Sequence, residues 1–364
     1  MSTAITPSLF EAYNLAGLTL KNRIVMSPMT RCRATPGHTP TALQADYYGQ
    51  RTDAGLIISE GTAPSPNGTG YARIPGIYSE EQVNAWKAIT EAVHKGGSKM
   101  FVQLMHTGRI SHPLNMPEGA RVLSSSAVKP AGQMWTDQQQ MQNYPVPEEM
   151  TLEDVRQVIA EFGKAAVNAM KAGFDGVELH GANGYLLEQF LNPNVNQRAD
   201  EFGGSVKNRV SFVLKVVDSV IAEVGANRTG IRLSPYGAAS DMKPYSEVDE
   251  TYNYLAEELS KRGIAYIHEV DHSSMGAPPV PQSIKDSIRS LFKRTLILAG
   301  GFTKETAEEA ISSGKGDLVA FGRPFISNPD LVSRFSQGNP LGEWDMATFY
   351  SAGAEGYTDY ATCG

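Results

Sequence analysis

Short apolar runs recur along the chain and alternate with longer segments whose apolar residues are spaced three or four positions apart. Two of the runs, around residues 56–58 and 296–299, are apolar at successive positions, which is typical of parallel strands buried on both faces. The complete set of predicted strands comprises residues 24–28, 55–61, 99–106, 176–181, 229–235, 266–270, 296–301 and 318–323.

The segments between these runs have the period of amphipathic helices. Residues 151–172 begin with Thr151 and Asp154 in a capping-box spacing and continue with Val155, Val158 and Phe162 on one face. Similar patterns cover residues 205–223, 247–262 and 303–313. Repeated strand–helix alternation predicts an α/β fold, and eight repeats favour a (β/α)8 TIM barrel over an open sheet.

Two segments do not fit the repeat. Residues 13–23 alternate around a turn and are predicted to form an N-terminal hairpin under the barrel, the alternative being a plain extension. Residues 111–149, after the third strand, are rich in Pro, Gln, Met and Asn, and we expect an excursion over the barrel, either a hairpin or a disordered loop. The length of 364 residues suits one large barrel, so a single domain over residues 1–364 is predicted.

Composition narrows the function classes. The net charge of −7 and the lack of a Lys/Arg run argue against nucleic acid as a partner. No apolar run approaches the roughly 20 residues of a membrane helix, and two cysteines are too few for a disulfide scaffold. With no secretory signal in the sequence, we expect a cytoplasmic protein. The first two strand ends carry no His-x-His pair, so a metal site is not predicted.

Chemistry is expected at the carboxyl ends of the strands, where barrel enzymes place it. The last two strands end in Gly300-Gly301 and Gly322-Arg323. Glycines let backbone N–H groups approach an anion and the guanidinium group adds a fork of donors, so this pair of loops predicts a phosphate site. The alternative is two helix caps and a surface arginine.

Two polar residues lie inside apolar strands. Arg232 must be paired or face a ligand, and an internal salt bridge to Glu178 or Glu60 is as good an interpretation as a ligand site. Gln103 likewise needs hydrogen-bond partners within its strand.

The fourth strand is followed by His180, Asn183 and Tyr185 in a glycine-containing loop. These residues could serve a substrate, or they could simply satisfy the loop backbone and the core. Two other kinds of enzyme lack the residues that they would need. A Schiff-base aldolase needs a lysine at a strand end, and none is suitably placed. A Rossmann dinucleotide site needs a G-x-G-x-x-G fingerprint after a strand, and this is absent. Glu60 and Glu269 could act as a glycosidase pair, but the phosphate site would then have no use.

Taken in order, these motifs resemble the old yellow enzyme family of FMN-dependent ene-reductases. The resemblance extends from Asn22-Arg23 to the segment Ala354-Glu-Gly-Tyr-Thr-Asp-Tyr360, and it is greatest with the bacterial branch of N-ethylmaleimide and nitrate-ester reductases. It implies a barrel with FMN at its carboxyl-end face and NADPH (or NADH) as reductant. The implied cofactor-binding residues are Pro28, Met29, Thr30, Gly61, Gln103, Arg232, Gly300, Gly301, Gly322 and Arg323.

The same resemblance gives roles to the loop after the fourth strand. His180 and Asn183 would donate hydrogen bonds to a substrate oxygen, and Tyr185 would protonate the substrate after hydride transfer from the flavin. Tyr71 and Tyr350 resemble substrate-binding tyrosines. Asn183 stands where close bacterial relatives often have a second His. Met105 replaces an aromatic residue, and Cys32 is not the flavin-contacting Cys of another branch, whose place is taken here by Thr30.

The resemblance therefore implies a ping-pong reductase of electron-poor alkenes: α,β-unsaturated carbonyl, maleimide or nitro compounds. Its partners would be these small molecules and a nicotinamide, in a monomer or homodimer. Two alternatives remain from the residues alone. One is a flavin-independent, phosphate-binding isomerase or lyase that uses Tyr185 and His180, and the other is a non-catalytic flavin-binding protein.

Overall fold

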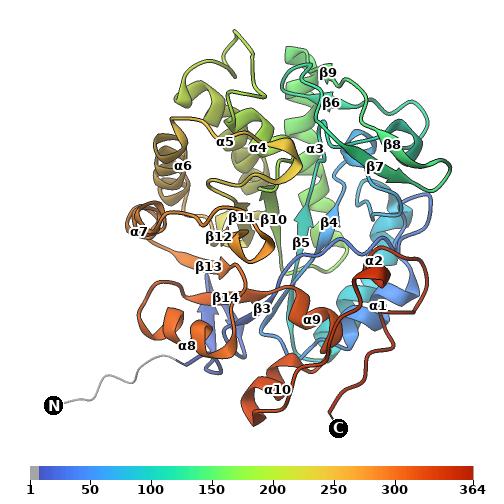
Figure 1. Ribbon diagram of the computed structural model, residues 1–364, viewed down its shortest axis with the longest axis vertical. Helices are drawn as coiled ribbons and strands as arrows, with labels where there is room; N and C mark the ends of the chain where they lie inside the picture. Colours follow the sequence, from blue (N-terminus) through green and yellow to red (C-terminus); the bar gives the residue numbers. More distant parts are fainter. Residues whose placement is uncertain (1–7, 364) are drawn as a thin grey trace.

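Eight parallel strands close into a barrel within residues 8–363, the part of the chain that the computed structural model describes (Figure 1). Each strand pairs with the next one along the chain, and the last pairs with the first, Phe321 opposite Met26. The barrel strands are β3 (Ile24–Met26), β4 (Leu56–Thr62), β5 (Lys99–Leu104), β10 (Gly176–Gly181), β11 (Thr229–Leu233), β12 (Tyr266–Val270), β13 (Thr295–Ala299) and β14 (Leu318–Phe321). The predicted (β/α)8 TIM barrel and its eight strands are confirmed.

Helices surround the barrel and cover the outward faces of the strands. The longest, α3 (Leu152–Lys171), begins with the expected box: Thr151 Oγ1 accepts from Asp154 N at 3.1 Å, and the Asp154 carboxylate accepts from Thr151 N at 2.9 Å. Its buried face packs against strand residues such as Val177 in one continuous core. The other covering helices are α1 (Ala42–Gly49), α2 (Glu80–Lys95), α5 (Val206–Val224), α6 (Val248–Arg262), α7 (Gln282–Leu291) and α8 (Lys304–Ser312).

Three further helices are short: α4 (Leu186–Leu191), α9 (Arg323–Ser327) and α10 (Leu331–Gln337). Across residues 8–363, none of the helices combines the length and the apolar character needed to cross a membrane. The single domain over residues 1–364 stays a prediction, and residues 1–7 and 364 lie outside the described part.

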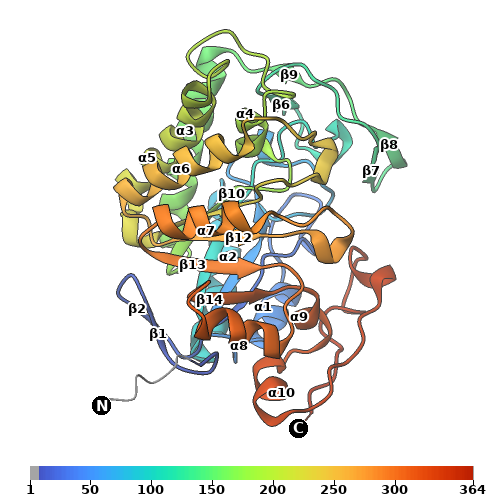
Figure 2. The same ribbon diagram turned by 60° about the vertical axis from the view of Figure 1, so that its left-hand side comes forward.

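The predicted N-terminal hairpin closes the amino end of the barrel. It consists of β1 (Tyr13–Leu15) and β2 (Leu18–Leu20), and it lies on the opposite side of the barrel from β7 and β8 (Figure 2). Leu15 and Leu20 pack with the inward-facing Leu56, Phe101 and Tyr266 in a second apolar cluster. Within the described residues, apolar side chains therefore fill the amino end of the barrel interior, and the carboxyl end is open for a site.

The predicted excursion after the third barrel strand carries its own pairing. An antiparallel hairpin is formed by β7 (Gln133–Thr136) and β8 (Gln140–Asn143), and the short strands β6 (Leu123–Ser124) and β9 (Glu148–Glu149) pair with each other in parallel. This hairpin and the C-terminal segment after α10 rise on the same side of the molecule (Figure 2).

The C-terminal segment is held by buried arginines from the other end of the sequence. Arg33 donates to the carbonyl groups of Thr348 (2.8 Å), Phe349 (2.7 Å) and Glu355 (3.0 Å). Arg31 donates to Phe349 O and to Gly356 O at 2.7 Å. These guanidinium–carbonyl bonds fix residues 348–356 beside the carboxyl end of the barrel. Nothing in the sequence pattern predicted them.

Candidate active site

A cavity of about 1590 Å³ opens at the carboxyl end of the barrel. Its walls come from the ends of the strands, the β7–β8 hairpin and the C-terminal segment. Nearly all residues predicted for the site line it: Pro28, Met29, Thr30, Tyr71, Gln103, His180, Asn183, Tyr185, Arg232, Gly300, Gly301, Gly322, Arg323 and Tyr350. The structure thus brings together side chains that are spread over 300 residues of sequence.

Gly61 is the exception, because it does not line the cavity. A Cβ atom at this position would lie 2.5 Å from Met105 Sδ, and Met105 does line the cavity. The glycine makes room for the methionine, and its part in cofactor binding stays a prediction.

The two glycine-containing loops at β13 and β14 form one end of the cavity. Gly300 and Gly301 have φ angles of +148° and +76°, which favour glycine, and a Cβ on Gly301 would come within 2.4 Å of Ser274 Cβ. Arg323 lies across the loop, with its guanidinium carbon 5.6 Å from the centre of the Trp344 ring. Backbone donors and a cation converge here, as an anion site requires.

Arg232 lies on the barrel wall without an ion pair among residues 8–363. Its side chain is buried, and its Nε has no hydrogen-bond partner in that part of the chain. The salt bridge to Glu178 or Glu60 that the sequence left open is not formed. Gln103 instead uses Glu178, donating from Nε2 to Oε1 at 2.8 Å. A buried cation therefore faces the cavity with its charge unpaired, and a bound anionic or electron-rich ring would satisfy it.

The end of β10 and the loop after it place three polar groups over the same cavity. The imidazole ring of His180 packs edge-on against the Tyr185 ring, with centroids 4.9 Å apart. His180 Nδ1 and Asn183 Oδ1 are buried and find no hydrogen-bond partner in the described residues. Tyr185 meets a second tyrosine, and the hydroxyl groups of Tyr185 and Tyr71 are 3.0 Å apart.

Two of these residues have shifted pKa values that suit a neutral, proton-donating site. Burial, with the nearby charge of Arg232, lowers the pKa of His180 well below its usual range, so the imidazole is neutral at pH 7. Burial raises the pKa of Tyr185 to about 12, so the phenol keeps its proton. The site therefore offers neutral hydrogen-bond donors beside one positive guanidinium group.

A buried carboxyl group that sequence reasoning missed holds this loop in place. Glu188, on α4, accepts from Gly184 N at 2.6 Å and from the hydroxyl groups of Ser234 and Tyr252, both at 2.9 Å. Ser234 Oγ in turn accepts from Asn183 N at 3.0 Å, which supports Asn183 in its left-handed conformation (φ +61°). The signal was present in the sequence: Glu188 is the one charged residue in the mostly apolar helix that follows the loop.

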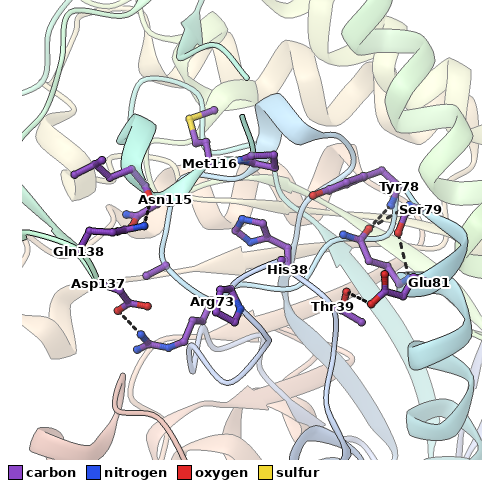
Figure 3. Close-up of a pocket in the computed structure, with 16 residues that line it drawn as sticks. His38, Thr39, Arg73, Tyr78, Ser79, Glu81, Asn115, Met116, Asp137 and Gln138 are labelled. Atoms are coloured by element: carbon purple, nitrogen blue, oxygen red, sulfur yellow. Dashed lines mark hydrogen bonds and ion pairs between the residues drawn. The ribbon is translucent and has the colours of Figure 1, made fainter. Parts of the chain in front are cut away.

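The mouth of the cavity is apolar. Seven large side chains around it are more than a third exposed: Trp135, Met141, Met275, Leu341, Trp344, Met346 and Tyr350. A smaller pocket of about 320 Å³, which includes His38, adjoins it (Figure 3). Arg73 borders both pockets and is paired with Asp137 of the β7–β8 turn, as Figure 3 shows.

The sequence profile of the NADH:flavin oxidoreductase / NADH oxidase family matches residues 8–342, most of the chain. The chain belongs to this family.

Relatives of this flavin oxidoreductase are similar over almost their whole length. A protein of Oryza sativa subsp. japonica called 12-oxophytodienoate reductase 7 is 39% identical, over 98% of this chain and 95% of its own. Among solved structures, morphinone reductase has a TM-score of 0.95 at 39% identity, covering 99% of this chain and 98% of its own. The old yellow enzyme homologue of Zymomonas mobilis has a TM-score of 0.93 at 40% identity, covering 98% of both chains. The resemblance to the old yellow enzyme family is confirmed, and the chain is a flavin ene-reductase of that family.

Family membership also gives the cofactor, FMN, and a nicotinamide reductant. The residues present fit FMN on independent grounds. Gly300, Gly301 and Arg323 suit its phosphate, and the unpaired Arg232 beside Gln103 suits the electron-rich pyrimidine edge of its ring. No group of His, Cys, Asp and Glu side chains within residues 8–363 is arranged to hold a metal ion.

Proposed function

We propose that this flavin oxidoreductase reduces C=C bonds conjugated to a carbonyl, imide or nitro group, with NADPH or NADH as the reductant. The observation that carries the proposal is the meeting of three side chains over the cavity that suits the flavin. His180 and Asn183 have buried polar atoms, Nδ1 and Oδ1, without a hydrogen-bond partner among residues 8–363, and Tyr185 contributes a protonated phenol. Relatives named 12-oxophytodienoate reductase and morphinone reductase support it.

His180 and Asn183 act by binding the oxygen atom of the activating group. Each donates a hydrogen bond, and this withdraws electron density from the conjugated double bond, so its far carbon becomes electrophilic. A neutral imidazole has one N–H to give. Because His180 Nδ1 is buried without a partner, we assign that N–H to Nε2, facing the substrate.

Tyr185 completes the reduction by giving its proton to the carbon next to the activating group. Bound FMN supplies the hydride for the other carbon. Once Tyr185 has lost its proton, its phenolate oxygen carries a negative charge. The Tyr71 hydroxyl, 3.0 Å away, donates a hydrogen bond to this oxygen and stabilises the charge. Tyr71 thus acts on the proton donor, and Tyr350, which is 62% exposed, contacts substrate at the mouth of the cavity.

The proposal is tested by Tyr185→Phe in the purified FMN-loaded enzyme. Anaerobic stopped-flow absorbance should show flavin reduction by NADPH at nearly the wild-type rate and reoxidation by 2-cyclohexenone slowed by about 100-fold or more, the usual share of a general acid. Tyr236→Phe is the matched control, since Tyr236 bonds to Asp249 outside the cavity and should leave both rates unchanged.

Each alternative has its own outcome in this experiment. Reoxidation of the Tyr185→Phe enzyme at the wild-type rate would show that Tyr185 is not the proton donor. That result would favour the alternative of a non-catalytic flavin-binding protein. A lyase or isomerase would keep its turnover after FMN is removed; family membership argues against that alternative. We further propose a cytoplasmic protein, monomeric or homodimeric, whose partners are these small molecules.

A further inference from the structure

A layer of buried polar groups lies inside the barrel, between the apolar plug and the cavity. Glu178 and His268 are completely buried, and Gln103 and Arg232 beside them reach the cavity. The pairing of the strands brings these groups together, because Glu178 is opposite Gln103 and Arg232 is opposite His268. Nothing in the proposed alkene chemistry uses Glu178 or His268.

Both carboxyl oxygens of Glu178 accept a hydrogen bond. Oε1 accepts from Gln103 Nε2 at 2.8 Å, and Oε2 is 2.9 Å from His268 Nδ1. A carboxylate only accepts, so the amide of Gln103 must turn its NH2 group to Glu178 and its carbonyl oxygen away from it. The pyrimidine edge of a flavin carries one N–H group, and an amide oxygen is the partner that this N–H requires.

Glu178 also sets the balance of charge in this layer. Burial lowers the pKa of His268, so its ring is neutral and the Nδ1–H donates to Glu178. Burial lowers the pKa of Arg232 too, whereas the Glu178 carboxylate acts in the opposite direction. The carboxylate is therefore the group that offsets the charge of the unpaired guanidinium at the cavity.

We infer that Glu178 is a positioning residue for the flavin: it fixes the amide orientation of Gln103 and balances the charge of Arg232. The inference rests on FMN binding, which the family gives, and not on the proposed reaction with alkenes. It concerns the affinity of the site for the two oxidation states of the cofactor, because negative charge near the ring disfavours the electron-rich reduced state.

The test replaces Glu178 by Gln, which keeps the shape and removes the charge. We expect the reduced form of FMN to gain affinity about tenfold relative to the oxidised form, equal to a rise of about 30 mV in the two-electron midpoint potential. The potential is measured by anaerobic dye equilibration, and the FMN dissociation constant by flavin fluorescence. Glu269→Gln is the control at pH 8, because Glu269 is the neighbour of His268 on β12 but lies toward α7, near Lys285.

A second variant keeps the inference open to refutation if Glu178→Gln does not fold. Glu178→Asp retains the charge and shortens the reach to Gln103, so FMN binding should weaken several-fold while the potential stays close to wild type. A potential and an FMN affinity in Glu178→Gln equal to those of the Glu269→Gln control would overturn the inference. So would wild-type FMN binding in Glu178→Asp. Neither result depends on turnover of an alkene, so a failure here is separate from a failure of the proposed function.

Discussion

Replacing Glu188 by Gln tests how the substrate loop is held. In the wild-type protein the Glu188 carboxyl is 4% exposed and accepts hydrogen bonds from Gly184 N, Ser234 Oγ and Tyr252 Oη. Glutamine fits the same space and retains one accepting oxygen, but its NH2 group opposes at least one of the three donors. Leaving a buried donor unsatisfied costs about 1–3 kcal/mol of stability.

The same substitution removes the Glu188 carboxyl group, whose pKa differs between the folded and the unfolded protein, so that its protonation makes stability depend on pH. Burial raises the pKa of the Glu188 carboxyl from 4.5 to about 7. Between these pH values the folded protein binds the proton more tightly than the unfolded chain, so the free energy of unfolding falls as pH rises and levels off above about 7. The wild-type protein should therefore lose about 2–3 kcal/mol of stability between pH 5 and 8 through this residue, a loss that the Gln variant lacks.

The measurement is urea unfolding of both FMN-saturated proteins at a series of pH values from 5 to 8, followed by far-UV circular dichroism. Asp53, Glu60 and Glu269 also have raised pKa values, but they are common to both proteins and cancel in the difference. The exposed Glu118→Gln provides a control with no change in slope. A stability difference between wild type and Glu188→Gln that stays constant across this range would refute the reasoning.

Two further predictions concern the phosphate end of the cavity and the C-terminal segment. Gly301→Ala, with a Cβ 2.4 Å from Ser274 Cβ, should weaken FMN binding by about tenfold or more in fluorescence titration. Gly314→Ala, equally left-handed but in open space, should not. Arg33→Met leaves buried carbonyl groups unpaired and should lower the free energy of unfolding by about 3 kcal/mol. The exposed Arg156→Met is the control and should change the free energy of unfolding by less than about 0.5 kcal/mol. Equal losses in the two variants would contradict this prediction.

The barrel could be predicted because its signals are local. Strands buried on both faces are apolar at successive positions, and most of them are followed by a segment of helical period, so the pattern alone predicted the alternation of strands and helices. The polar residues that interrupt this pattern marked the site. Arg232 and Gln103 stood out within apolar strands, and both line the cavity. The pattern could not tell whether Arg232 was paired, because that depends on distances across the barrel.

The residues that support the site could not be predicted, since their partners are distant in sequence. Tyr71 and Tyr185 are 114 positions apart, and their hydrogen bond follows from the closure of the barrel. Glu188 could have been noticed as a charge in an apolar helix, but not as the acceptor for Gly184. The contact that a side chain at Gly61 would make with Met105 was not evident from the sequence either.

The order in which the chain is synthesised matters for this architecture. Strand β3 pairs with β14, and Arg31 and Arg33 bind carbonyl groups of residues 348–356. A nascent chain therefore carries an open sheet edge until β14 (Leu318–Phe321) has left the ribosome, and two charged side chains without their partners until residues 348–356 have followed. During that time the edge of β3 is free to pair with another chain. The cavity wall formed by Phe349 and Tyr350 is synthesised after all eight barrel strands, so the complete site for FMN forms only once the whole barrel has been made.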